Sequence, residues 1–290
     1  MTNVSPDPFA LEMDAFTTLA KITQDASGLQ LFPEKRLMVQ SRLKPRLSAL
    51  QIHDFSSYVA HVQSADGKSE LRHMISALTT NVTQFFREFH HFEMLTEVLV
   101  PVLRRKIASN DRVRIWSAGC SKGQEPYSIA MHLLHALPAL AEADFKILAT
   151  DIDPKVVSHA IRGEYDRKEL EAVPQELVNA FIAPGHDHQT VRINENLARH
   201  IVFKELNLVQ SWPMRGQFDA IFCRNVVIYF KAETQEKLWP RFTTALHPEG
   251  VLFLGHSERI GEPSDFGLKS IGTTAYAHAT SGLHASSTKN

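Results

Sequence analysis

From residue 113 onward, short runs of apolar residues alternate with longer segments of helical periodicity. This alternation is typical of parallel strands joined by helical crossovers. We therefore predict an α/β fold with a doubly wound, Rossmann-like sheet that carries helices on both faces. The strand candidates are residues 113–116, 145–149, 218–223, 251–254 and 274–278, and the helix candidates are residues 126–137, 154–162 and 234–246.

The part of the chain before residue 113 has a different pattern. Apolar residues between 9 and 92 recur at helical spacing, and no alternating strand pattern occurs there. A small helical domain is therefore expected ahead of the sheet domain. The expected divisions are a loose leader at 1–9, an N-terminal helical domain at 10–85, an interdomain helix or linker at 86–110, the sheet domain at 111–280 and a disordered tail at 281–290.

Residues 164–205 interrupt the alternation of the sheet domain. The stretch is polar, contains Pro184 followed by Gly185, and includes two short strand candidates at 190–193 and 200–203. We expect these two strands to pair within a small inserted antiparallel β-subdomain.

Composition limits the partners and the compartment. A net charge of −1, from 31 basic and 32 acidic residues, argues against bulk affinity for nucleic acid or anionic lipid. No apolar run approaches the roughly 18 to 20 residues that cross a bilayer, and no secretory signal is visible. Two cysteines cannot form a disulfide framework. We therefore expect a cytoplasmic protein with no nucleic-acid partner and no direct membrane insertion.

Fifteen histidines raise the question of a metal site. His90 and His91 are adjacent, and two further histidines flank Asp187, but neither group has a cysteine or acid cluster at convincing ligand spacing. We expect no metal.

A glycine-containing loop at residues 117–123 follows the first strand and precedes a helix. Glycines there allow the backbone to turn tightly and to approach a ligand closely. Glu125 lies at the start of that helix, where it would repel a pyrophosphate but attract a cation such as S-adenosylmethionine. Lys122 could offset this charge, and Glu125 could also act only as a favourable charge at a helix N-terminus. Charge alone therefore leaves the ligand open.

The second strand is followed by two acids. Asp151 closes the strand and can accept hydrogen bonds from ribose hydroxyls, which occur in both NAD and S-adenosylmethionine. Asp153 directly precedes Pro154, and it is expected to cap the helix that begins there.

Four segments have distinctive sequences at a characteristic order and spacing. They are TTNVTQFFRE at 79–88, WSAGCSKGQEPYS at 116–128, FDAIFCRNVVIYF at 218–230 and GHSE at 255–258. With these segments, the chain from about residue 10 to 278 resembles the chemotaxis receptor protein-glutamate O-methyltransferases of the CheR type. The resemblance implies transfer of a methyl group from S-adenosylmethionine to glutamate side chains of membrane chemoreceptors. The products would be glutamate methyl esters and S-adenosylhomocysteine.

The resemblance also implies roles for individual residues. Glu125 would meet the methionine part of the donor, Asp151 the ribose, and Asn207 and Leu208 the adenine. Arg87 and Tyr229 would touch the reacting groups, because a guanidinium can align a carboxylate and a tyrosine ring can face a sulfonium. The expected donor-binding set is Asn81, Thr83, Arg87, Glu125, Asp151, Asn207, Leu208, Arg224 and Asn225.

Receptor contact is expected at a basic helix over residues 34–48, which in the family meets the acidic methylation helices of the receptor. Pro45 would kink this helix or end it early. The turn at 183–188 of the insertion lacks the Gly-x-x-Gly spacing of peptide-binding relatives, which argues against tethering to a receptor C-terminal peptide. The expected receptor-binding residues are Lys35, Arg36, Arg42 and Arg46.

Two other classes of protein remain as alternatives. An NAD-dependent oxidoreductase could use a similar sheet, but a full Gly-x-Gly-x-x-Gly is missing and Glu125 is unfavourable for a pyrophosphate. A non-catalytic module could bind the donor or the receptor for regulation, although the chain retains Arg87, Asn225 and Tyr229.

Overall fold

The computed structural model describes residues 10–284, so the expected leader at 1–9 and residues 285–290 of the expected tail lie outside the described residues. The chain divides into two compact units. One consists of the chain up to Thr80 together with Tyr229–Lys231, and the other of Asn81–Ile228 together with the chain from Ala232.

The first unit is helical. Its apolar face residues pack into one core that includes Phe16, Leu43, Tyr58 and Met74, each at most 2% exposed. Asp54 caps one helix, because its side chain accepts a hydrogen bond from the Ser57 amide. The helices are α1 (Met13–Ser27), α2 (Arg36–Ala49), α3 (Phe55–Gln63) and α4 (Lys68–Leu78), with short 3-10 turns at Pro33–Lys35 and Ala65–Gly67.

Helix α2 contains Pro45 and continues to Ala49. The expectation that the proline would end the helix early is therefore wrong. Val39, Leu43 and Leu47 on the buried face of α2 keep the helix against the core on both sides of the proline. This packing outweighs the lost backbone hydrogen bond.

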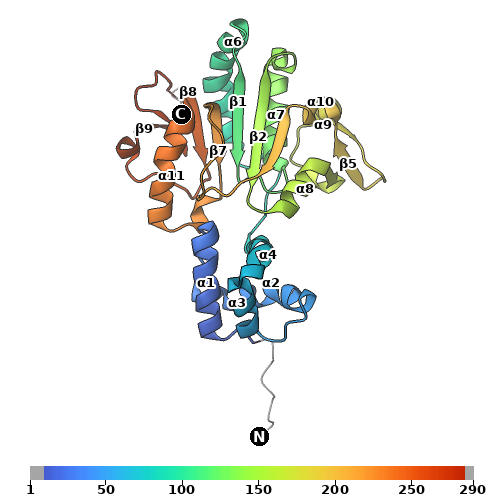
Figure 1. Cartoon of the computed structure of the whole chain (residues 1–290). Helices are drawn as coiled ribbons and strands as arrows, with labels where there is room; N and C mark the ends of the chain where they lie inside the picture. The colour runs from blue at the N-terminus through green and yellow to red at the C-terminus, as the bar shows by residue number, and fades with distance from the viewer. Residues whose placement is uncertain (1–9, 285–290) are drawn as a thin grey trace. The chain divides into compact units, whose positions relative to one another are not determined.

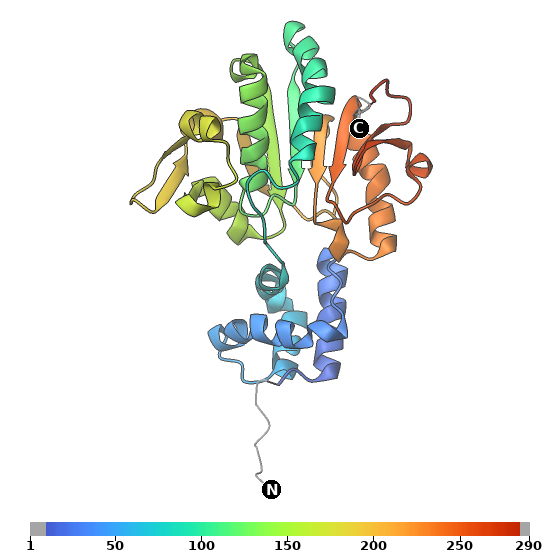
Figure 2. The same cartoon turned by 180° about the vertical axis from the view of Figure 1, so that it is seen from behind.

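The second unit is built on a seven-stranded sheet (Figures 1 and 2). The strand order is β6-β2-β1-β7-β8-β10-β9, with the first five strands parallel and β10 antiparallel to both β8 and β9. This order confirms the predicted doubly wound α/β sheet. The strands are β1 (Val113–Ala118), β2 (Phe145–Asp151), β6 (Ile201–Glu205), β7 (Phe218–Cys223), β8 (Leu246–Leu254), β9 (Leu268–Gly272) and β10 (Ala275–His278).

Helices cover both faces of this sheet: α6 and α7 lie in front of it in Figure 2, and α11 lies on the opposite face. A π-helical turn at Leu95–Leu99 joins α5 to α6 just before Pro101, which cannot donate a regular helical hydrogen bond. The helices are α5 (His90–Met94), α6 (Val100–Ala108), α7 (Gln124–Ala136), α8 (Pro154–Arg162) and α11 (Ala232–Ala245), with 3-10 turns at Pro138–Ala141, Val227–Tyr229 and Pro263–Phe266.

The insertion after α8 forms a small sheet of its own, as expected, but with different strand pairing. β5 (Thr190–Ile193) pairs antiparallel with β3 (Glu164–Asp166) and β4 (Ile182–Pro184). The expected partner at 200–203 instead belongs to β6, which runs parallel to β2 in the main sheet. A strand pattern in the sequence does not identify the partner strand, so this pairing was wrongly predicted. The segment also contains a 3-10 turn (Arg167–Leu170), α9 (Gln175–Phe181) and α10 (Glu195–Ala198).

The first residues of the expected tail have defined contacts. The Ser281 carbonyl accepts a hydrogen bond from Lys269 Nζ at 2.5 Å, and Leu283 packs against the core of the sheet unit. Residues 281–284 therefore do not fit the expectation of disorder. Within residues 10–284, no helix is both long enough and apolar enough to span a bilayer.

Candidate active site

The carboxyl ends of the parallel strands bring the predicted ligand loop to one edge of the sheet. The switch point lies at β1, because β2 and β6 follow on one side of it and β7 and β8 on the other. The loop after β1 includes Gly119, with φ 90°, and its amide donates a hydrogen bond to the Thr150 carbonyl at 2.8 Å. A Cβ at Gly119 would lie 2.3 Å from a methyl group of Val226. Only glycine fits this turn.

Asp151 is a buried acceptor at the end of β2 and is 8% exposed. One carboxylate oxygen accepts the Ser121 amide at 2.8 Å and the other accepts the Asp153 amide at 3.0 Å. Burial raises the pKa of Asp151 to about 6, although the amide hydrogen bonds favour its charged form. The carboxylate is thus fixed in direction before any ligand arrives.

Asp153 connects α8 to the segment that contains Asn81. Its side chain accepts the Lys155 amide at 3.0 Å, which confirms the expected helix cap. The other carboxylate oxygen accepts Asn81 Nδ2 at 2.9 Å, and the Asn81 carbonyl accepts Ser121 Oγ at 3.0 Å. The start of the 81–88 segment is therefore attached to the carboxyl edge of the sheet.

Glu125 is paired with a buried guanidinium. Arg224 Nε donates to one Glu125 oxygen at 2.8 Å and Ser117 Oγ donates to the other at 2.7 Å. The side chains of Arg224 and Glu125 are 2% and 10% exposed. Lys122 was the residue that the sequence suggested could offset the Glu125 charge, whereas Arg224 neutralises it in the folded protein.

Arg224 also holds the segment on which Arg87 lies. Its Nη1 donates to the Arg87 carbonyl at 2.7 Å and lies 3.0 Å from His91 Nδ1. Burial lowers the pKa of His91 to about 3, so the ring is neutral and its Nδ1 can accept a hydrogen bond from Arg224. His91 was not predicted as a site residue, because only its spatial neighbours distinguish it from other histidines.

The side chain of Arg87 is 30% exposed and has few partners. Its Nη1 donates to the Val82 carbonyl at 3.3 Å, and its Nε lies 4.0 Å from Glu88 Oε1. The residues on either side, Phe86 and Glu88, have positive φ values of 52° and 58°, which is strained for non-glycine residues. Nearby, Thr83 is half-buried.

Asn225 follows Arg224 at the exit of β7, with φ 59°. Its Nδ2 lies 3.4 Å from Glu88 Oε1, and the same oxygen accepts the His256 amide at 3.1 Å. Glu88 and His256 thus connect the 86–89 turn to the exits of β7 and β8. Neither residue was given a role from the sequence.

Asn207 and Leu208 follow β6. The Asn207 side chain accepts the Val209 amide at 3.1 Å, which closes a local turn. The Leu208 carbonyl accepts two donors, Trp212 Nε1 at 3.1 Å and Arg241 Nη1 at 2.8 Å. Leu208 itself is 6% exposed.

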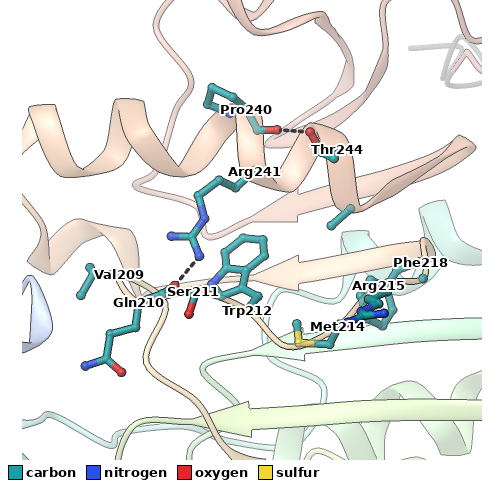
Figure 3. Close-up of a pocket in the computed structure, with 12 residues that line it drawn as sticks. Val209, Gln210, Ser211, Trp212, Met214, Arg215, Phe218, Pro240, Arg241 and Thr244 are labelled. Carbon is teal, nitrogen blue, oxygen red and sulfur yellow. Dashed lines mark hydrogen bonds between the residues drawn. The ribbon is translucent and has the colours of Figure 1, made fainter.

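A pocket of about 650 Å³ lies beside this loop, between it and α11 (Figure 3). Arg241 lies over the Trp212 ring at 4.0 Å from its centroid and also donates to the Gln210 carbonyl. None of the predicted site residues lines the pocket, so it is not the predicted donor site. Its lining consists of Val209, Gln210, Ser211, Trp212, Met214, Arg215, Gly216, Phe218, Pro240, Arg241, Thr244 and Ala245.

Tyr229 groups with the helical unit. Its carbonyl accepts the Gln30 amide at 2.8 Å, Phe230 forms a bridge with Leu29, and the tyrosine side chain packs against the helical core. The nine predicted donor-binding residues, by contrast, all belong to the sheet unit. The role of Tyr229 in the reaction stays a prediction.

Three of the four predicted receptor-binding residues use their guanidinium groups inside the helical unit. Arg36 donates to the Leu11 carbonyl at 2.6 Å, and Arg42 donates to the carbonyls of Leu78 and Thr79 at the end of α4. Lys35 is exposed.

Arg46 forms a two-bond ion pair with Glu70, at 3.0 and 2.6 Å, and Tyr58 Oη donates to the same carboxylate at 2.7 Å. Burial acts to raise the pKa of Glu70, but these hydrogen bonds leave it below its usual value. Arg46 therefore stabilises the packing of α2, α3 and α4.

Residues 81–276 match the family described as CheR methyltransferase, SAM binding domain. The sheet unit is therefore a methyltransferase domain that binds S-adenosylmethionine, as predicted. Residues 14–79 match the CheR methyltransferase all-alpha domain, and the chain belongs to the CheR chemotaxis protein methyltransferase family. This finding removes the NAD-dependent oxidoreductase alternative. In the described range 10–284, no group of three or more metal-ligating side chains occurs.

Curated relatives match along nearly their whole length. The chain is 44% identical to the probable chemotaxis protein methyltransferase of Rhizobium etli, over 89% of this chain and 97% of that protein. It is 40% identical to the chemotaxis protein methyltransferase of Salmonella typhimurium, over 92% and 91% of the two chains. For the Escherichia coli protein of the same name, the identity is 39% over 92% of each chain.

Proposed function

We propose that this protein methylates glutamate side chains of chemoreceptors, with S-adenosylmethionine as the donor and glutamate methyl ester and S-adenosylhomocysteine as products. The observation that carries the proposal is the location of Arg87, Glu125, Asp151 and Arg224 in one sheet unit. Arg224 contacts both Glu125 and the Arg87 carbonyl, and Asp151 accepts the Ser121 amide of the loop that precedes Glu125. The chemotaxis names of the relatives support chemoreceptors as the acceptor.

Donor binding is assigned to nine residues of the sheet unit. Asp151 accepts hydrogen bonds from the ribose hydroxyls, and its fixed orientation favours this role. Glu125 interacts with the methionine part of the donor, and its pairing with Arg224 means that the two residues act as one ion pair without net charge. The remaining assignments are Asn207 and Leu208 beside the adenine, and Asn81, Thr83, Arg87 and Asn225 around the rest of the donor.

The chemistry needs no general base, because an ionised glutamate is already a nucleophile. One carboxylate oxygen forms a bond to the methyl carbon while the carbon–sulfur bond breaks. The electron pair of the broken bond stays on the sulfur and neutralises the sulfonium. No proton is transferred. The protein contributes orientation, and Arg87 has free donor capacity to align the incoming carboxylate. Tyr229 is assigned to the same step, facing the sulfonium.

The acceptor is assigned to the cytoplasmic methylation helices of chemoreceptors, which makes this a cytoplasmic enzyme. We propose that the receptor contacts four basic residues of the helical unit: Lys35, Arg36, Arg42 and Arg46. Lys35 is the most available of the four, since the three arginines donate to neighbouring groups in their own unit. Neither nucleic acid nor membrane insertion has a part in this function.

Tethering to a receptor C-terminal peptide is not part of the proposal. The turn between β4 and β5 is closed by its own side chains, because Asp187 accepts the amides of Gln189 and Thr190 at 2.9 and 2.7 Å. Together with the missing Gly-x-x-Gly spacing, this favours a purely local role for the turn.

Labelled methyl transfer to receptor cytoplasmic domains tests the function. Incubation with methyl-labelled S-adenosylmethionine should label the receptor domain, and mild base should release the label because the product is a carboxyl ester. Receptor domains with glutamine in place of the acceptor glutamates serve as the control and should stay unlabelled. Base-stable label would indicate methylation of nitrogen, and donor binding without any transfer would favour the regulatory-module alternative.

Arg87→Ala should lower turnover roughly 100-fold while weakening donor binding much less, because loss of carboxylate alignment affects the reacting geometry first. Steady-state kinetics and calorimetry with S-adenosylhomocysteine would measure the two effects. Arg104→Ala, an exposed arginine on α6, is the matched control and should behave as wild type. Wild-type turnover in Arg87→Ala would remove this residue from the mechanism.

A further inference from the structure

The GHSE segment at 255–258 ends in a buried carboxylate without an assigned role. Glu258 is 3% exposed and accepts four backbone amides. Its Oε2 accepts Gly255 at 2.6 Å and Asn225 at 2.8 Å, and its Oε1 accepts Val226 at 2.8 Å and Ile228 at 3.2 Å. One side chain thus joins the turn after β8 to the exit of β7.

The environment of this carboxylate is unusual because its hydrogen-bond donors are neutral amides. Burial raises the pKa of Glu258, while the four amides favour its charged form. A buried carboxylate is costly in free energy, and a surface turn can be closed more cheaply by a neutral Ser or Asn side chain. The Glu258 carboxylate is a stronger acceptor than a neutral side chain, and this strength is useful if the loop at residues 225–228 has to be rigid.

The loop that Glu258 holds contains two residues assigned to donor binding. Asn225 has a left-handed backbone, and the amides of Asn225, Val226 and Ile228 all donate to Glu258. This backbone sends the Arg224 side chain to Glu125 and the Asn225 side chain toward Glu88. The loops also interlock, because a Cβ on Gly255 would lie 2.6–2.8 Å from Asn225 atoms and from Glu258 Oε2.

We propose, on the basis of the function proposed above, that Glu258 is a positioning residue for methyl transfer. Its carboxylate fixes the backbone of residues 225–228, and through it the directions of Arg224 and Asn225. It acts without touching the donor or the acceptor. The residue was visible in the sequence as part of a motif, but its four partners are main-chain amides, which leave no signal in the pattern of side chains.

The test uses the full-length protein and the isosteric variant Glu258→Gln. The amide keeps the size of the side chain, but its NH₂ group must face backbone N–H groups, so at least one pair of hydrogen bonds is lost. We expect kcat/KM for S-adenosylmethionine to fall roughly 10- to 100-fold and the affinity for S-adenosylhomocysteine to fall with it. Hydrogen exchange of the amides of residues 225–228 should become faster.

Glu249→Gln is the matched control, because Glu249 lies on β8, the strand that leads into the Glu258 turn, and its side chain is 47% exposed. It should keep wild-type kinetics and exchange. Glu258→Asp keeps the charge with a shorter reach and should lie between wild type and Glu258→Gln. It also provides the measurement if the glutamine variant does not fold.

A purely structural role would lower the melting temperature and leave kcat/KM and the affinity for S-adenosylhomocysteine unchanged well below that temperature. This result in either variant would overturn the proposal. Failure of the proposed function would look different, because wild type itself would then give no base-labile methyl transfer.

Discussion

Replacing Asp151 with alanine should weaken the binding of S-adenosylmethionine and S-adenosylhomocysteine about 100-fold. The change removes the acceptor assigned to the ribose hydroxyls, and hydrogen bonds to a charged group contribute about 1.5–3 kcal/mol each. It also leaves the amides of Ser121 and Asp153 without their acceptor, so the loop after β1 loses a support. Isothermal titration calorimetry at neutral pH measures the loss.

Asp111→Ala is the control for this prediction. Asp111 is exposed and lies just before the amino end of β1, at the edge of the sheet opposite the carboxyl ends. Its replacement should leave the affinity unchanged. If Asp151→Ala bound both compounds as tightly as Asp111→Ala does, Asp151 would have no contact with the ribose.

The pKa of Asp151 adds a test with a definite sign. Because burial raises this pKa to about 6, the carboxylate is protonated over a range of pH in which an exposed aspartate is charged. The charged form is the better acceptor, so donor affinity should rise with pH through about 6 and then level off. The slope should disappear in Asp151→Ala. A wild-type affinity that is flat between about pH 5 and 8 would contradict this assignment.

The periodicity of the sequence was sufficient to predict the fold class. Strands and helices of the sheet unit bury continuous apolar runs or stripes, and those are local patterns that the sequence shows directly. The end of a parallel strand also fixes the edge of the sheet at which a residue lies. For this reason Asp151 could be placed at the edge that includes the glycine loop without any knowledge of the structure.

Features that depend on distant partners could not be predicted in this way. Glu125 and Arg224 are 99 positions apart, and nothing in either neighbourhood indicates a buried pair. The same limit explains why β6 was assigned to the wrong sheet. Arg46 is a further example, because its helical spacing marks a basic residue but does not show that its guanidinium pairs with Glu70, which also accepts a hydrogen bond from Tyr58.

Residues whose partners are main-chain groups are even harder to identify. Glu88 and Glu258 both bond to backbone amides at the exits of β7 and β8. Positive φ values at Phe86, Glu88 and Asn225 belong to the same region, and a sequence does not show backbone strain at a non-glycine residue. Much of the support for the candidate site is therefore visible only in three dimensions.

Arg224→Met should destabilise the sheet unit by about 3–5 kcal/mol, because it leaves the buried Glu125 carboxylate without its cation. The Arg87 carbonyl and His91 would also lose a donor. Urea unfolding followed by tryptophan fluorescence is a suitable measurement, since Trp116, Trp212 and Trp239 all lie in the sheet unit.

Two matched variants separate charge burial from simple loss of packing. Arg105→Met breaks an equally short but exposed pair with Glu249 and should cost less than about 1 kcal/mol. The double variant Arg224→Met/Glu125→Gln removes both charges and should recover much of the stability lost in Arg224→Met. It should still bind the donor poorly, because the carboxylate assigned to the methionine part and its partner Arg224 are both gone. If Arg224→Met unfolded at the same urea concentration as Arg105→Met, the buried pair would contribute no more than a surface pair. The link from Glu125 through Arg224 to the Arg87 segment would then have no role in holding the site together.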